Sequence, residues 1–202
     1  MNVSAIQFLQ RENLRLKQEN ETLERDKRSL NGYLEILQSI YWVSQTITLE
    51  ENILDGFNKL LHAVMSVMGA KDGSLSRLNS NTNELTFLAV FGDLQEQLPG
   101  HRIKSDVGIA GWVVSNGKPL IVNNPRQDWR FSQTVDEEFG FFTNSILSVP
   151  VMKYGQVLGL MQTLNKPGDE FTEADIGLLL TLAQVAVMVL EELQSREALN
   201  PG

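Results

Sequence analysis

The sequence predicts an α+β domain, an antiparallel sheet with helices on its faces, preceded by a long coiled-coil helix. Three observations support this fold class. Leucine recurs every seven residues near the amino terminus, the apolar period changes between helix and strand along the chain, and strand-like segments come in closely spaced pairs. The 202 residues provide for one ordinary domain in addition to the helix.

Residues 1–47 are predicted to form a parallel, two-stranded coiled coil that holds two copies of the chain side by side. Polar residues at some core positions give up packing but specify register and strand number. The alternative is an amphipathic helix that folds against its own domain. The predicted dimer seam consists of Leu9, Asn13, Leu16, Asn20, Leu23, Leu30, Leu34 and Leu37.

Residues 48–198 are predicted to form the globular domain. Its first helix begins at a capping box made by Thr48 and Glu51, carries a continuous apolar face and ends at Gly69. Two strands follow at 73–78 and 85–91, and the polar turn between them predicts a hairpin. A glycine-terminated helix at 108–117 and a buried strand at 120–122 come next.

The second half of the domain begins with a loop at 123–131, which is too long and too specialised in composition for a simple turn. Two strands are predicted at 145–152 and 157–164, and Thr172 caps a helix that runs to about Glu197. That helix is apolar on more than one side, so it needs a second helical partner, either the amino-terminal helix or another copy. Because Thr181 and Gln184 interrupt its apolar run, we expect no membrane span.

Composition excludes several functional classes. The chain has no cysteine, which excludes disulfides, thiolate nucleophiles and zinc–cysteine sites. A net charge of −8 argues against nucleic-acid binding, and only eight residues precede the first heptad leucine, too few for a basic zipper. The first ten residues lack a basic start followed by an apolar run, so we expect a cytoplasmic protein without a signal peptide.

We expect no enzymatic activity and predict no catalytic residue. The two histidines, His62 and His101, lie in no cluster that could form a nucleophile–base pair or a metal site, and no glycine-rich phosphate loop is present. No metal site is predicted, and the sequence names no cofactor.

From about Leu49 to Leu193 the chain resembles a GAF domain, the small-molecule sensory module of phosphodiesterases, phytochromes and bacterial regulators. The resemblance rests on GIAGWVVSNGKPLIVNN at 108–124, DWRF at 128–131, SILSVPVMKYGQVLGLMQTLNK at 145–166 and FTEADIGLLLTLAQVAV from 171. Family members that reduce free methionine sulfoxide or attach a bilin covalently need cysteine, so neither role suits this chain.

Asn165, Lys166, Phe171 and Asp175 match a signature of the cyclic-nucleotide-binding members, although Ile176 stands where the signature has glutamate. Lys166 ends a strand and Asp175 lies in the first turn of the last helix, where an acidic group suits the helix dipole. An ion pair between them would clamp that helix to the sheet with or without a ligand. The four residues are therefore predicted to form a structural clamp, and a cyclic nucleotide stays an alternative ligand.

The resemblance implies that a ligand lies between the sheet and the segments over 123–143. Small and polar side chains there could orient a ligand, and aromatic ones could form walls. Each candidate residue could instead have a purely structural role. Asp128 and Arg130 can hold a loop in place by hydrogen-bonding each other, and the phenylalanines can belong to the core. The candidate ligand-binding residues are Ser76, Asn124, Asp128, Arg130, Phe131, Phe142, Thr143 and Ser145.

The sequence thus predicts a dimeric regulatory protein that binds a small molecule, such as a cyclic nucleotide or another metabolite. Its terminal helices would transmit the bound state to a separate output protein, because few residues follow the last helix. The alternative is a ligand-free dimeric scaffold or docking module.

Overall fold

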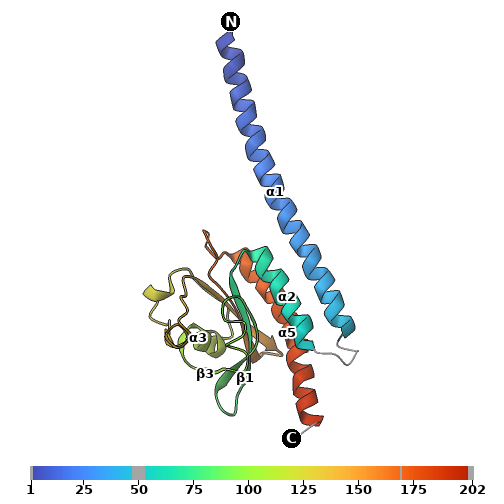
Figure 1. The fold of residues 1–202 in the computed structure, drawn as a ribbon, viewed down its shortest axis with the longest axis vertical. Coiled ribbons are helices and arrows are strands. Elements are labelled where there is room, and N and C mark those ends of the chain that lie inside the picture. The colour runs from blue at the N-terminus through green and yellow to red at the C-terminus, as the bar shows by residue number, and fades with distance from the viewer. Residues whose placement is uncertain (1, 47–52, 169, 200–202) are drawn as a thin grey trace.

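The computed structural model describes residues 2–46, 53–168 and 170–199. It begins with one continuous helix, α1 (Asn2–Thr46), whose amino-terminal part projects far beyond the rest of the molecule (Figure 1). The remaining elements in chain order are α2 (Ile53–Met68), β1 (Asp72–Asn79), β2 (Glu84–Phe91), β3 (Arg102–Lys104), α3 (Gly108–Asn116), β4 (Leu120–Val122), the 3₁₀ helix η1 (Pro125–Gln127), α4 (Thr134–Phe139), β5 (Ile146–Lys153), β6 (Gln156–Leu164) and α5 (Glu173–Leu199).

The strands form one six-stranded antiparallel sheet in the order β3-β2-β1-β6-β5-β4. The predicted α+β fold class is therefore confirmed, and so are the β1–β2 hairpin and the β5–β6 pair. β3 was not predicted, because its three residues are too few to show a strand period.

Helices lie on both faces of the sheet. α2 and α5 pack side by side on one face, and α3 lies on the other (Figure 1). The amphipathic face of α2 is buried against β1 and α5, as its three- and four-residue apolar spacing requires. Its glycine terminator, Gly69, has a φ of +66°, which a side chain would disfavour.

α5 is the central helix of the core. Thr181 and Gln184 do not make this helix too polar for a span, because by length and composition alone Glu173–Arg196 could cross a membrane; the absence of a membrane span therefore stays a prediction. In the fold, α5 buries side chains such as Leu179 and Ala186 against the sheet and α2. Its second helical partner is thus α2 of the same chain, which the sequence did not identify.

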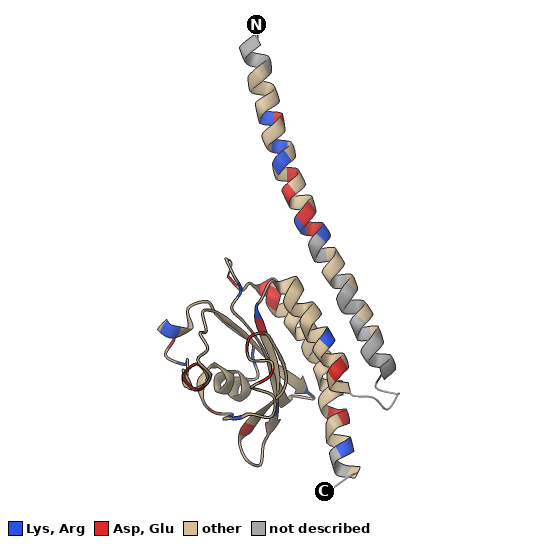
Figure 2. Ribbon diagram, in the orientation of Figure 1, with Lys and Arg blue, Asp and Glu red and all other residues tan. Residues whose placement is uncertain are grey.

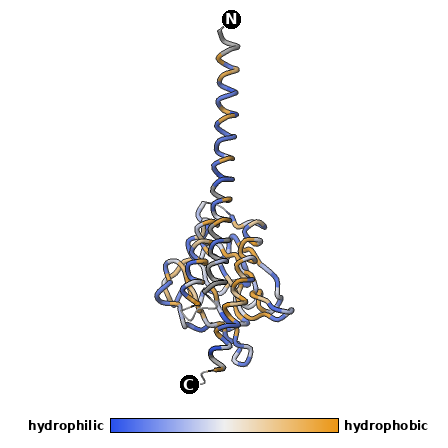
Figure 3. The backbone as a smooth tube through the Cα atoms, turned by 90° about the vertical axis from the view of Figure 1, so that its right-hand side faces the viewer, coloured by the Kyte–Doolittle hydropathy of each residue, from blue (hydrophilic) through white to orange (hydrophobic). Residues whose placement is uncertain are grey.

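The predicted amino-terminal helix is confirmed as α1, and its coiled-coil pairing stays a prediction. Its carboxyl-terminal part packs on α2, where a β-carbon at Gly32 would lie 2.2 Å from Val67 Cγ2. The projecting part carries mixed charges and scattered apolar residues (Figures 2 and 3). Leu9, Leu16 and Leu23 are between 51% and 64% exposed there. The Leu37 side chain and the predicted capping box, Thr48 and Glu51, lie outside the described residues.

Candidate functional site

A cavity of about 480 Å³ lies between the sheet and the segments that cover the face opposite α2 and α5. This volume is typical of small-molecule sites. Most of its walls are apolar and come from β2, the loop before β3, α3 and the segments around α4. The main apolar lining residues are Phe87, Val90, Leu94, Leu98, Ile109, Phe131, Phe141, Ile146 and Leu164.

Two polar side chains stand next to each other on the sheet floor of this cavity. Ser74 of β1 pairs in register with Gln162 of β6, so their side chains share one face. Within the described part of the chain, neither side chain makes a hydrogen bond, and Ser74 is only 5% exposed. A hydroxyl and a carboxamide without partners offer both donors and acceptors to a bound molecule. The sequence analysis did not single out either residue as a candidate.

The amino-terminal end of α3 borders the same cavity through Gly108, Ile109 and Ala110. Its N-cap residue, Val107, makes no side-chain capping bond. The first amides of a helix carry a partial positive charge, so this end can accept an electronegative group. A φ of +74° at Gly108 produces the sharp turn into the helix.

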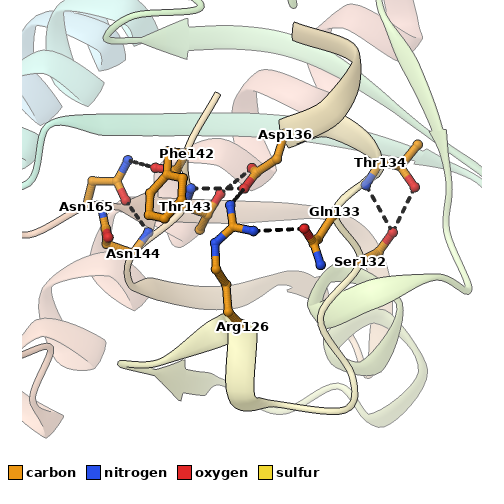
Figure 4. Close-up of polar contacts among 9 residues, drawn as sticks. All are labelled: Arg126, Ser132, Gln133, Thr134, Asp136, Phe142, Thr143, Asn144 and Asn165. Atoms are coloured by element: carbon orange, nitrogen blue, oxygen red, sulfur yellow. Dashed lines mark hydrogen bonds and ion pairs between the residues drawn. The ribbon is translucent and has the colours of Figure 1, made fainter. Parts of the chain in front are cut away.

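Asp136 of α4 organises the segments that cover the cavity (Figure 4). Its carboxylate accepts hydrogen bonds from Thr143 N at 3.0 Å, Thr143 Oγ1 at 2.6 Å and Arg126 Nη2 at 2.9 Å. Arg126 also donates to Gln133 and lies 4.0 Å from the ring centroid of Phe142. Asp136 therefore fixes η1, α4 and the segment before β5 relative to one another. No sequence signal distinguished it from its exposed acidic neighbours.

The structure brings only two of the eight predicted ligand residues, Phe131 and Thr143, to the cavity wall. Ser76 shares the face of Ser74 but does not line the cavity. Asn124, Phe142 and Ser145 also lie outside it. Phe142 is 57% exposed beneath Arg126, whereas the Ser145 hydroxyl accepts a bond from the Lys166 amide at 3.2 Å.

Asp128 and Arg130, also predicted to bind ligand, bond each other instead. Arg130 Nη2 lies 2.6 Å from Asp128 Oδ2, and the guanidinium carbon lies 5.1 Å from the centroid of the Trp112 ring. The hydrogen bonds from Arg130 lower the pKa of the Asp128 carboxyl. The pair therefore has the structural role of holding its loop in place, and it does not line the cavity.

The four residues of the predicted clamp meet where β6 ends and α5 begins. Lys166 Nζ lies 3.1 and 2.9 Å from the two carboxylate oxygens of Asp175, and Asp175 also accepts bonds from Thr172 N and Oγ1. Phe171 is buried, and its backbone N–H donates to Asn123 Oδ1 at 3.0 Å.

Asn165 has a separate role in this arrangement. It adopts a φ of +58° and donates from Nδ2 to Asp72 Oδ2 at 3.0 Å and to the Phe142 carbonyl at 3.1 Å. Its Oδ1 accepts a bond from Asn144 N at 2.8 Å (Figure 4). Asn165 thus connects the end of β6 with the cavity at Asp72 and with the segment that leads from α4 to β5.

The chain matches the family model described as GAF domain over residues 51–191. This chain belongs to the GAF domain family. Among the described residues of this GAF domain protein, no group of three or more His, Asp or Glu side chains is arranged to hold a metal ion.

Curated relatives include cyclic nucleotide phosphodiesterases. The chain is 26% identical over 164 residues to the probable 3′,5′-cyclic phosphodiesterase pde-5 of Caenorhabditis elegans, covering 77% of this chain and 22% of that protein. It is 30% identical over 128 residues to the dual 3′,5′-cyclic-AMP and -GMP phosphodiesterase 11A of Takifugu rubripes, covering 58% of this chain and 14% of that protein. The similarity therefore concerns a small part of each enzyme.

Solved GAF domains share this fold. The GAF domain of a phosphoenolpyruvate-protein phosphotransferase from Acinetobacter superimposes with a TM-score of 0.65 at 22% identity, covering 81% of this chain and 97% of that one. The corresponding domain from Coxiella burnetii gives 0.66 at 18% identity, with 82% and 96% covered. GAF domains are small-molecule sensing and regulatory modules, and this chain has the architecture of one.

Proposed function

We propose that this GAF protein is a dimeric cytoplasmic sensor that binds a small organic molecule in the 480 Å³ cavity. The observation that carries the proposal is the floor of that cavity. Ser74 and Gln162 present unpaired polar groups to a cavity whose walls are mostly apolar, the combination that orients and holds a ligand. The proposed role is regulatory, without catalytic turnover.

A cyclic nucleotide is one candidate ligand. The similarity to proteins named as cyclic nucleotide phosphodiesterases supports this candidate. The amino-terminal end of α3, which has no side-chain cap, supports it too, because its free amides could bind a phosphate group. Another metabolite with a flat, hydrogen-bonding ring would suit Ser74, Gln162 and the surrounding phenylalanines equally well.

Binding would reach the helices through the contacts around Asn165. This residue contacts Asp72 at the cavity and precedes Lys166, which is ion-paired with α5. α5 packs on α2, and α2 packs on α1. A ligand that binds one arrangement of these contacts more tightly than another would shift their equilibrium, and α1 would pass the change to an output protein.

The exposed leucines of α1 support the proposed dimerisation. A helix that projects without tertiary contacts gains little stability from its own backbone, whereas pairing in a coiled coil buries one apolar residue per turn. Leu9, Leu16, Leu23 and Leu30 are all more than half exposed in one chain and lie at heptad spacing.

Thermal unfolding of the purified chain against a panel of cyclic nucleotides and common metabolites tests the sensor directly. A ligand at 100 times its dissociation constant should stabilise the protein by about 2.7 kcal/mol. Ser74→Leu, which puts a bulky apolar side chain on the cavity floor and removes the hydroxyl, should abolish that stabilisation, and Ser115→Leu on the exposed side of α3 should retain it. A panel without any effect on the parent chain would favour the alternative, a ligand-free dimeric scaffold.

A further inference from the structure

The cavity contains a buried carboxylate without a counter-ion. Asp72, at the start of β1, lines the cavity and is 5% exposed. It appears in no ion pair among the described residues, in contrast to Asp136, the other buried carboxylate of the cavity, which pairs with Arg126. Burial of an unpaired charge is costly, so a group that supplies the missing charge would bind there favourably.

Both groups that donate hydrogen bonds to Asp72 are neutral. Asp93 N donates to Oδ1 and Asn165 Nδ2 donates to Oδ2, each at 3.0 Å. Gly92, with a φ of +105°, permits this close approach, since a β-carbon there would lie 2.2 Å from Oδ1. Burial raises the pKa of Asp72 and outweighs the two hydrogen bonds and the charge of the adjacent Lys71, which act in the opposite direction. Each carboxylate oxygen retains capacity for a further hydrogen bond.

Among the described residues, neither the cationic side chains that line the cavity nor the adjacent Lys71 forms an ion pair with Asp72, although the Lys71 charge acts on it from a distance. Arg102 and Lys104 of β3 are both exposed, and Arg102 Nη1 lies 3.7 Å from Glu84 Oε2. The polar groups near Asp72 are the buried Ser74, two residues along the same face of β1, and the partly buried Gln162 on the adjacent strand. Ser74 is 5% exposed as a residue, and its hydroxyl makes no hydrogen bond among the described residues, which independently indicates that this end of the cavity can receive a ligand.

We propose that Asp72 determines the ligand class of this cavity by binding a protonated nitrogen, so that the ligand is an ammonium- or amidinium-bearing molecule with an apolar or aromatic body. The inference rests on the proposed sensor function. The nitrogen donates a charge-assisted hydrogen bond to Asp72 and neutralises the buried charge. The body of the ligand packs on the phenylalanine walls, and Ser74 and Gln162 serve as further hydrogen-bonding partners.

The same contact links ligand binding to α5. A nitrogen bound to Asp72 contacts the same carboxylate that accepts the hydrogen bond from Asn165 Nδ2. Asn165 precedes Lys166, which is ion-paired with Asp175 of α5. Asp72 is also the residue that holds the start of the 92–101 segment, through the Asp93 amide. Occupation of Asp72 therefore acts on a cavity wall and on the clamp together.

Two matched series of probes test the proposal on the full chain by NMR titration. One consists of 2-phenylethylamine, 2-phenylethanol and 3-phenylpropionate, and the larger one of tryptamine, tryptophol and indole-3-propionate. We expect the amine of at least one series to bind at least 10-fold more tightly than its alcohol and acid. The Asp93 amide and the Asn165 side-chain amide should shift on amine binding, because both donate to Asp72.

Asp72→Asn should remove the preference for the amine, and Asp128→Asn, which alters a carboxylate outside the cavity, should retain it. An alcohol or acid that binds the parent chain as tightly as the amine overturns the proposal without any variant. So does a cyclic nucleotide that stabilises the parent while no amine binds, although the sensor function would then stand. Absence of binding by every probe and every cyclic nucleotide would contradict both proposals.

Discussion

Lys166 Nζ lies 2.9 Å from Asp175 Oδ2, so the end of β6 is ion-paired with the first turn of α5. The two side chains are 16% and 11% exposed, which protects the pair from solvent screening. The carboxylate also lies at the positive end of the helix dipole. This pair holds α5 against the sheet at the point where the proposed signal passes from the sheet to α5.

Removal of the carboxylate should destabilise the fold. We expect Asp175→Ala to lower the free energy of unfolding by about 2 kcal/mol, because Lys166, Thr172 N and Thr172 Oγ1 all lose their acceptor. Urea unfolding measures the loss. Glu173→Ala, an exposed acid in the same turn, should cost less than about 1 kcal/mol. Equal losses would show that the dipole, and not the clamp, is responsible.

The Asp128–Arg130 pair should make stability depend on pH in the acid range. Hydrogen bonds from Arg130 lower the pKa of Asp128 in the folded state, so its contribution is complete above the unfolded pKa of about 3.9. The contribution is lost as the pH falls through the folded pKa. Asp128→Asn should therefore cost about 1 kcal/mol at pH 7 and progressively less below about pH 4. Urea unfolding across this range, with Asp106→Asn on an exposed loop as control, checks the trend.

Gly32 should be intolerant of a side chain although it lies within a helix. Alanine normally stabilises a helix interior by about 1 kcal/mol relative to glycine. At Gly32 the added carbon would meet Val67, so we expect Gly32→Ala to destabilise the protein by about 1 kcal/mol as α1 moves off α2. Gly177→Ala in α5, where a β-carbon meets nothing within 4 Å, should stabilise it instead. A gain in unfolding free energy at both positions would contradict the α1–α2 packing.

The polar positions of the predicted seam should limit how tightly two chains associate. Asn13→Ile combined with Asn20→Ile should lower the dimer dissociation constant, measured by sedimentation equilibrium, and relax the choice of strand number. Gln18→Ile, outside the seam on the same helix, should leave association nearly unchanged. A parent chain that is monomeric at high concentration would exclude the paired sensor.

The order of helices and strands was predictable because local signals determine it. Three elements each combine an apolar period with a turn residue of positive φ: the hairpin, the short helix before Gly117 and the strand pair around Tyr154. β3 and the packing of α5 on α2 were not predictable, since a three-residue strand has no period and an apolar helix does not specify its neighbour.

Sequence alone determined that this protein has a long amino-terminal helix and an α+β domain of GAF type, because both are encoded in periods and turns of neighbouring residues. Tertiary structure decided which side chains form the cavity. Asp72, Ser74 and Gln162 meet there because strand register joins residues about 90 positions apart, while Asp128 and Arg130 bond each other and turn away. Contacts of that kind depend on packing in three dimensions, which no local pattern records.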